Sequence, residues 1–190
     1  MPPLPAPPPS SFSCLTLPTL ALAAFGLAGC AFTADTQAMM PPALELSQRH
    51  PGSVVVVATG TPRTLGIGRA SISDAALRDA VAGAIRSSGL FAEVLEGERA
   101  DYRLEVEVRE LEKPESGLDM TAALTTHWQL ERSATRERVW SEDVSTSFRA
   151  TPDDGETLEE RRRVAIEGAV RRAIEQALGS LSSVELPPGD

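Results

Sequence analysis

The side chains that most often perform catalysis are few in this sequence and form no recognisable group. The two histidines, His50 and His127, lie in segments far apart in the chain, and Ser145 lacks the Gly-x-Ser-x-Gly motif of a hydrolase nucleophile. Glu105 and Glu107 are spaced to share one face of a strand, but neighbouring arginines favour ion pairs over an acid pair. We therefore expect solvated histidines and no catalytic site, with an enzyme of unfamiliar type as the alternative.

Cys30 is the residue whose setting points to a covalent reaction. It follows Leu27, Ala28 and Gly29, and an uncharged apolar run that begins at Leu15 precedes them. This run suits the hydrophobic region of a secretory signal and is shorter than the roughly 20 residues that a transmembrane helix needs. The small residues would let a peptidase hold the backbone in extended form just before Cys30. The pattern predicts cleavage there, with a plain secreted protein or a retained membrane helix as alternatives.

Leu27-Ala28-Gly29-Cys30 resembles the lipobox of bacterial lipoproteins at all four positions. In that family the Cys thiol receives a diacylglyceryl group, the signal is removed, and the new amine is acylated. The resemblance implies that residues 1–29 are a lipoprotein signal peptide and that Cys30 carries the lipid, palmitate included. Ala31 follows in place of an Asp, which in Gram-negative lipoproteins implies the outer membrane, facing the periplasm.

Composition argues against several classes of partner. The net charge is −9, and residues 1–29 contain no charged side chain, so the acidity belongs to the remainder. An acidic chain gains nothing from the counterion release that drives DNA and RNA binding. Cys14 and Cys30 are the only cysteines, so no disulfide or thiolate metal site is available after cleavage. We expect no metal and no cofactor, and attachment to the membrane through covalent lipid.

The pattern beyond Cys30 predicts one α+β domain. Prolines and small polar residues in 30–52 are typical of a flexible tether. Residues 53–183 show helix and strand periods in the order β-α-β-β-β-β-α, and 184–190 form a C-terminal tail. The β-branched run from Val54 to Val57 indicates a strand covered on both faces. Each helix has one apolar face, which predicts a two-layer sandwich with two helices on one face of a mostly antiparallel sheet of four to five strands.

One strand of this sheet is expected to have a polar face. Apolar and charged residues alternate from Tyr102 to Glu110, so the charged ones point away from the core. These are Arg103, Glu105, Glu107 and Arg109. A flat charged surface suits a partner that needs positioning. We interpret the four residues as a possible partner-binding face, with simple solvation as the alternative.

The order of elements resembles that of several small envelope lipoproteins. The stretch Ala100-Asp101-Tyr102-Arg103-Leu104-Glu105-Val106 is similar to the first long strand of YajG-type lipoproteins and of auxiliary lipoproteins of ABC-type envelope transporters. The plan of residues 53–182 is also similar to LptE, a lipopolysaccharide-assembly lipoprotein. These families share no catalytic residues, so the resemblance implies a non-enzymatic binding, scaffolding or assembly protein with an envelope protein as partner. A lipid-binding transporter accessory is the alternative, and it requires an apolar cavity between helices and sheet.

Overall fold

The computed structural model describes residues 34–61, 72–97, 99–114 and 117–187. The predicted signal, the lipobox and Cys30 lie outside these residues. The elements in chain order are α1 (Thr36–Met39), β1 (His50–Thr59), α2 (Asp74–Ser88), β2 (Phe91–Leu95), β3 (Tyr102–Glu112), β4 (Met120–Arg132), β5 (Arg138–Ala150), the 3-10 turn η1 (Pro152–Asp154) and α3 (Leu158–Leu181). From β1 onward, the predicted order of strands and helices is confirmed.

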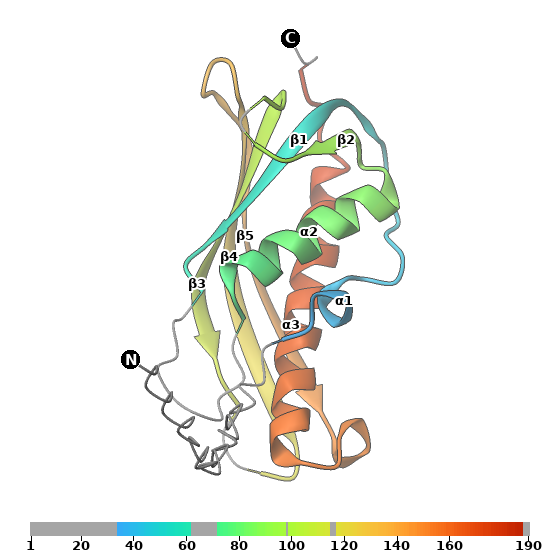
Figure 1. Ribbon diagram of the computed structural model, residues 1–190, viewed down its shortest axis with the longest axis vertical. Helices are drawn as coiled ribbons and strands as arrows, with labels where there is room; N and C mark the ends of the chain where they lie inside the picture. Colours follow the sequence, from blue (N-terminus) through green and yellow to red (C-terminus); the bar gives the residue numbers. More distant parts are fainter. Residues whose placement is uncertain (1–33, 62–71, 98, 115–116, 188–190) are drawn as a thin grey trace, which may run out of the picture.

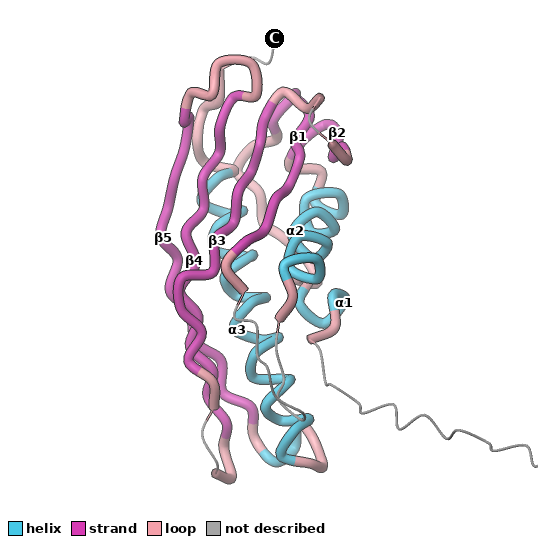
Figure 2. Tube along the Cα trace, turned by 60° about the vertical axis from the view of Figure 1, so that its left-hand side comes forward, coloured by secondary structure: helices cyan, strands magenta, loops and turns pink. Residues whose placement is uncertain are grey.

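The strands form one five-stranded sheet in the order β2-β1-β3-β4-β5. β1 pairs in parallel with both β2 and β3, whereas β3, β4 and β5 pair antiparallel, so the sheet is mixed. Figures 1 and 2 show α2 and α3 on one side of this sheet, with α3 along its length. The predicted two-layer α+β class is confirmed. None of the described helices is long and apolar enough to cross a bilayer.

Local signals set the ends of both long helices. The Ser73 side chain accepts a hydrogen bond from Ala76 N, and α2 ends at Gly89, whose φ of 66° suits a glycine. At the start of α3, Thr157 and Glu160 form a reciprocal capping box. These caps satisfy backbone donors that a helix leaves unpaired in its first turn.

The core lies between the helices and one face of the sheet. Leu104, Val106 and Trp128 of the sheet are at most 1% exposed, as are Ile85 of α2 and Ile174 of α3. The prediction that the valine run is covered on both faces is wrong. Val54 and Val56 are buried, but Val55 and Val57 on the other face are only half-buried, because both long helices lie on the same side.

Residues 34–49 are not the predicted flexible tether, because they pack onto the helices. Met39 of α1 is fully buried, and α1 contacts both α2 and α3. The Asp35 backbone N–H donates to Glu167 Oε1 at 2.8 Å, and Arg171 Nε donates to the Ala38 carbonyl at 2.9 Å. Burial is the main reason why the pKa of Glu167 is raised. The apolar side chain and the two polar contacts fix this segment to α3.

The prediction of a solvated His50 is also wrong. His50 is 4% exposed, and its Nε2 lies 3.2 Å from the Leu181 carbonyl oxygen. The centroid of its ring is 5.1 Å from the centroid of the Phe91 ring. Desolvation by burial lowers the pKa of His50, while the contact with Leu181 opposes that shift.

The described part of the C-terminal tail is docked in the same region. Gln48 Nε2 donates to the Val184 carbonyl at 2.6 Å, and the Tyr102 hydroxyl donates to the Pro187 carbonyl. The two ends of the described chain therefore help to close the core.

Candidate functional site

The face of the sheet opposite the helices carries the residues that the sequence singles out. We call it the helix-free face and define it by Arg103, Glu105 and Glu107 of β3, His127 of β4 and Asp143 of β5. The strand register places Glu107 opposite His127, and His127 opposite Asp143. The alternating burial along β3 places Arg103, Glu105 and Glu107 on the side of the strand away from the core.

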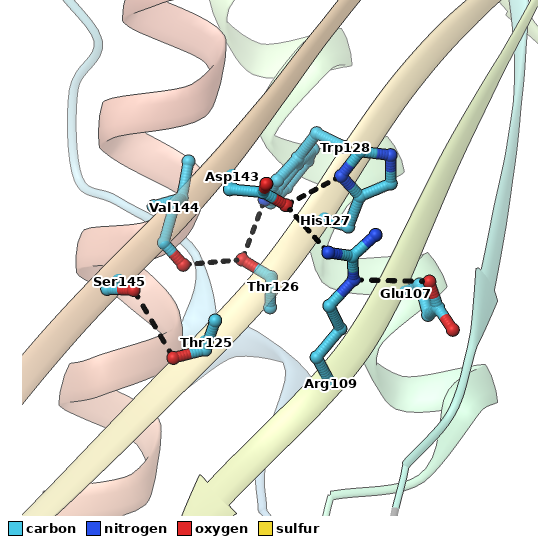
Figure 3. A network of polar contacts seen from close by, with 9 residues as sticks. All are labelled: Glu107, Arg109, Thr125, Thr126, His127, Trp128, Asp143, Val144 and Ser145. Atoms are coloured by element: carbon cyan, nitrogen blue, oxygen red, sulfur yellow. Dashed lines mark hydrogen bonds and ion pairs between the residues drawn. The ribbon is translucent and has the colours of Figure 1, made fainter.

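Arg109 belongs to the same group and lies at a β-bulge in β3. The register shifts between Val108 and Glu110, so Arg109 is an extra residue without its own partner on β4. Its side chain reaches across the sheet, and Nη1 lies 3.3 Å from Asp143 Oδ1. Its Nε lies 3.6 Å from Glu107 Oε2 (Figure 3). One arginine thus links carboxylates from two strands that are not neighbours.

His127 is paired with a carboxylate, which corrects the expectation that it is freely solvated. Its Nδ1 lies 2.7 Å from Asp143 Oδ1, the same oxygen that Arg109 contacts. The His127 side chain is 22% exposed and borders a hollow of about 260 Å³, whose walls include Glu105, Glu107 and Gln129. Asp143 therefore fixes the orientation of the imidazole beside a small, acid-lined depression.

A buried hydrogen-bonded chain supports this network from the other side of the sheet. Trp128 Nε1 donates to Thr126 Oγ1 at 2.8 Å, and Thr126 Oγ1 donates to the Val144 carbonyl at 3.3 Å (Figure 3). Thr126 and Trp128 are each 1% exposed, and they flank His127 along β4. The strand under His127 is consequently held by well-packed neighbours.

The arrangement of these side chains is suited to holding charge. An oriented histidine acts as a general base only when a nucleophile lies within about 2.6–3.2 Å of its free nitrogen. No hydrogen bond to His127 Nε2 occurs among the described residues, and Ser145 instead shares a 3.2 Å hydrogen bond with Thr125. Residues 34–61, 72–97, 99–114 and 117–187 also contain no group of three metal-ligating side chains close enough to hold an ion.

Sequence reasoning missed Asp143 and the bulge. Asp143 follows a usable signal, since it alternates with the buried Val144 and therefore points to the polar side of β5. The bulge has no comparable signal, because the residue types at the end of β3 are polar and would be compatible with a strand whether or not Arg109 pairs with β4.

Comparisons with known proteins show the fold. No family model matches this chain, and no curated protein matches it. Protein XCC0632 from Xanthomonas campestris, of family DUF330, is similar in structure at a TM-score of 0.54 and 19% identity, over 80% of this chain and 92% of that one. The hypothetical protein CT253 from Chlamydia trachomatis is similar at 0.53 and 9% identity, over 70% and 96%.

A minor lipoprotein from Acinetobacter baumannii is more distant. Its TM-score is 0.45 at 10% identity, over 69% of this chain and 92% of that one. A likeness at this level carries no inference about function.

Proposed function

We propose that this protein is a non-enzymatic lipoprotein of the bacterial outer membrane that faces the periplasm and serves as a binding, scaffolding or assembly accessory of the cell envelope. The observation that carries the proposal is the apolar run that ends in Leu27-Ala28-Gly29-Cys30. Lipid on Cys30 would hold the protein at the membrane, since each buried acyl CH₂ contributes about 0.8 kcal/mol and more than one chain makes attachment stable.

The packed N-terminal segment supports a close association with the bilayer. Residues 31–33 alone separate Cys30 from Ala34, which is 6% exposed. The four backbone steps from residue 30 to residue 34 span at most about 14 Å when fully extended. A lipid on Cys30 would therefore keep the folded domain beside the membrane instead of on the long tether that the sequence suggests.

Replacement of Cys30 by Ser tests the anchor, with Cys14→Ser as the matched control. We expect the intact mass of the wild-type protein and of Cys14→Ser to exceed that of the polypeptide cleaved before Cys30 by the mass of the lipid. Cys30→Ser should accumulate as an unacylated precursor. A wild-type mass equal to the plain cleaved polypeptide would rule out the anchor.

The helix-free face supports the binding role. Its charges lie on a sheet that is held from behind by the buried chain of Thr126 and Trp128, and the hollow beside Glu105, Glu107 and His127 has a volume of about 260 Å³. Such a surface suits a protein partner better than a substrate that must be enclosed.

A charge reversal tests this face. Glu105→Lys combined with Glu107→Lys should change the free energy of unfolding by only about 0–1 kcal/mol, because exposed ion pairs contribute little. It should weaken in-cell crosslinking to envelope proteins. Glu175→Lys with Glu185→Lys makes the same change in charge at exposed positions elsewhere and serves as the control. Equal crosslinking yields from both double variants would exclude the helix-free face as the binding surface.

The alternative of a lipid-binding transporter accessory is less well supported. It requires an apolar cavity between the helices and the sheet, but Leu104, Val106, Ile85 and Ile174 fill that space and are fully buried. A hollow of about 680 Å³ does lie between α2 and β1, but at the open edge of the sheet and lined by charged side chains such as Arg78 and Arg86.

A further inference from the structure

One edge of β1 is paired for only part of its length. β2 follows β1 as far as the pair Val55 and Leu95, whereas β3 accompanies β1 on its other side up to Thr59. From Val56 to Thr59, the peptide groups on the side away from β3 have no strand partner among the described residues. An unpaired edge presents backbone donors and acceptors that can pair with another extended chain.

A groove runs along this free edge. α2 lies beside β1 (Figure 1), and the hollow between them has a volume of about 680 Å³. Its walls include Val57 of β1, Ala82 of α2 and Val94 of β2. A volume of this size lies within the range of roughly 300–1,000 Å³ that is typical of ligand sites. The groove thus combines an unpaired backbone edge with apolar walls.

Two of the arginines that line the groove have no ion-pair or hydrogen-bond partner in the described part of the chain. Arg78 is paired with Asp79 at 2.8 Å, and Asp74 accepts a hydrogen bond from Thr61 N at 3.0 Å. Arg86 and Arg103 form no ion pair or hydrogen bond with any other described residue.

The two arginines flank the end of the groove where β2 stops. Arg86 lies in the last turn of α2. Arg103 lies on β3, opposite Val55 of β1. The described lining as a whole carries three arginines and three carboxylates, but Asp74 lies at the opposite end of α2 and Asp79 is paired with Arg78. At the end where β2 stops, Arg86 and Arg103 therefore face one carboxylate, Glu96. In a chain with a net charge of −9, this local excess of positive charge favours an acidic ligand.

We infer that the groove binds an extended, acidic segment of another polypeptide, which adds to β1 as a strand in line with β2. Backbone hydrogen bonds to the free edge from Val56 to Thr59 would supply affinity. Acidic side chains on the two faces of the added strand would bind Arg86 on the α2 side and Arg103 on the helix-free side. This inference goes beyond the proposed function and does not depend on lipid at Cys30.

The test uses the full-length protein in mild detergent and a short fluorescein-labelled peptide of valine and glutamate in which glutamate occurs on both faces of a strand. One comparison peptide carries lysine for glutamate, and another carries N-methyl groups on alternate backbone nitrogens. We expect N-methylation to weaken binding by about tenfold or more, because each lost backbone hydrogen bond is worth roughly fivefold in affinity and the methyl groups remove more than one. Lysine should weaken binding at least as much. Hydrogen exchange should slow at the free-edge amides between Val56 and Thr59 when the glutamate peptide binds.

Variants of the groove locate the binding. The double variant Arg86→Glu with Arg103→Glu should lower the affinity for the glutamate peptide by about tenfold or more, because it removes charge-assisted hydrogen bonds. Arg138→Glu, at an exposed arginine at the start of β5, should leave binding unchanged. Ala75→Trp blocks the groove from an exposed position of α2 and should abolish binding without disturbing the core.

Several results would overturn the inference. Equal affinity for the N-methylated peptide would exclude strand addition, and equal affinity for the lysine peptide would exclude recognition by the arginines. Edge amides that become protected with rising protein concentration alone would identify a second copy of this chain as the occupant. Failure of the anchor experiment would leave the peptide titration unaffected, so the two proposals fail independently.

Discussion

The substitution Met39→Ala tests whether the N-terminal segment belongs to the folded domain. Met39 is fully buried between α1 and the helix layer, so its truncation removes apolar contacts and leaves a cavity. Such substitutions cost about 2–5 kcal/mol. Because a domain is stable by only about 5–15 kcal/mol in total, this single change should remove a large share of the free energy of unfolding.

Urea unfolding of the full-length protein, followed by fluorescence of Trp128 and Trp140, measures the loss. Gln37→Ala is the matched control, since Gln37 is exposed on the same short helix, and it should change stability by less than about 0.5 kcal/mol. The midpoint of Met39→Ala should fall while the slope stays constant, because the same surface is exposed on unfolding. Identical midpoints for the two variants would mean that residues 34–49 are a tether after all.

Two further predictions concern the core. Burial lowers the pKa of His50, so the unfolded chain takes up a proton more readily than the folded one; stability should fall as the pH drops below about 6.5, and less steeply in His50→Gln when the unfolding midpoint is measured against pH. Gly168→Ala would place a Cβ 2.3 Å from the Phe148 ring. The resulting strain of about 1–3 kcal/mol should outweigh the gain of about 1 kcal/mol in helix propensity, so thermal melting should shift downward. In a Phe148→Ala background the same substitution should raise the melting temperature, and a rise in the wild-type background would contradict the packing described here.

Much of the fold could be predicted because its signals are local. The alternation from Tyr102 onward identifies β3 and its polar face, and the residues Ser73 and Thr157 mark the beginnings of α2 and α3. Each of these signals depends on neighbours within a few positions along the chain.

The missed features depend on contacts between distant parts of the chain. Prolines near α1 suggest a flexible segment, yet Met39 is held by helices and Asp35 by Glu167, which lies 132 positions further on. The run of four valines cannot reveal which face the helices cover. The link from Arg109 to Asp143 depends on a bulge and on two strand registers. Tertiary packing, which no local pattern encodes, decides all three.

The attachment of the N-terminal segment to α3 also has a mechanical consequence. A pulling force on the chain before Ala34 would first load two polar contacts, from Asp35 to Glu167 and from Ala38 to Arg171. These contacts lie on α3, which packs against both β4 and β5, so this part of the load would pass to the antiparallel half of the sheet. Under tension, the contacts of Asp35 with Glu167 and of Ala38 with Arg171 should break first. Detachment of α1 would then lengthen the chain between Cys30 and the sheet while the sheet stays intact.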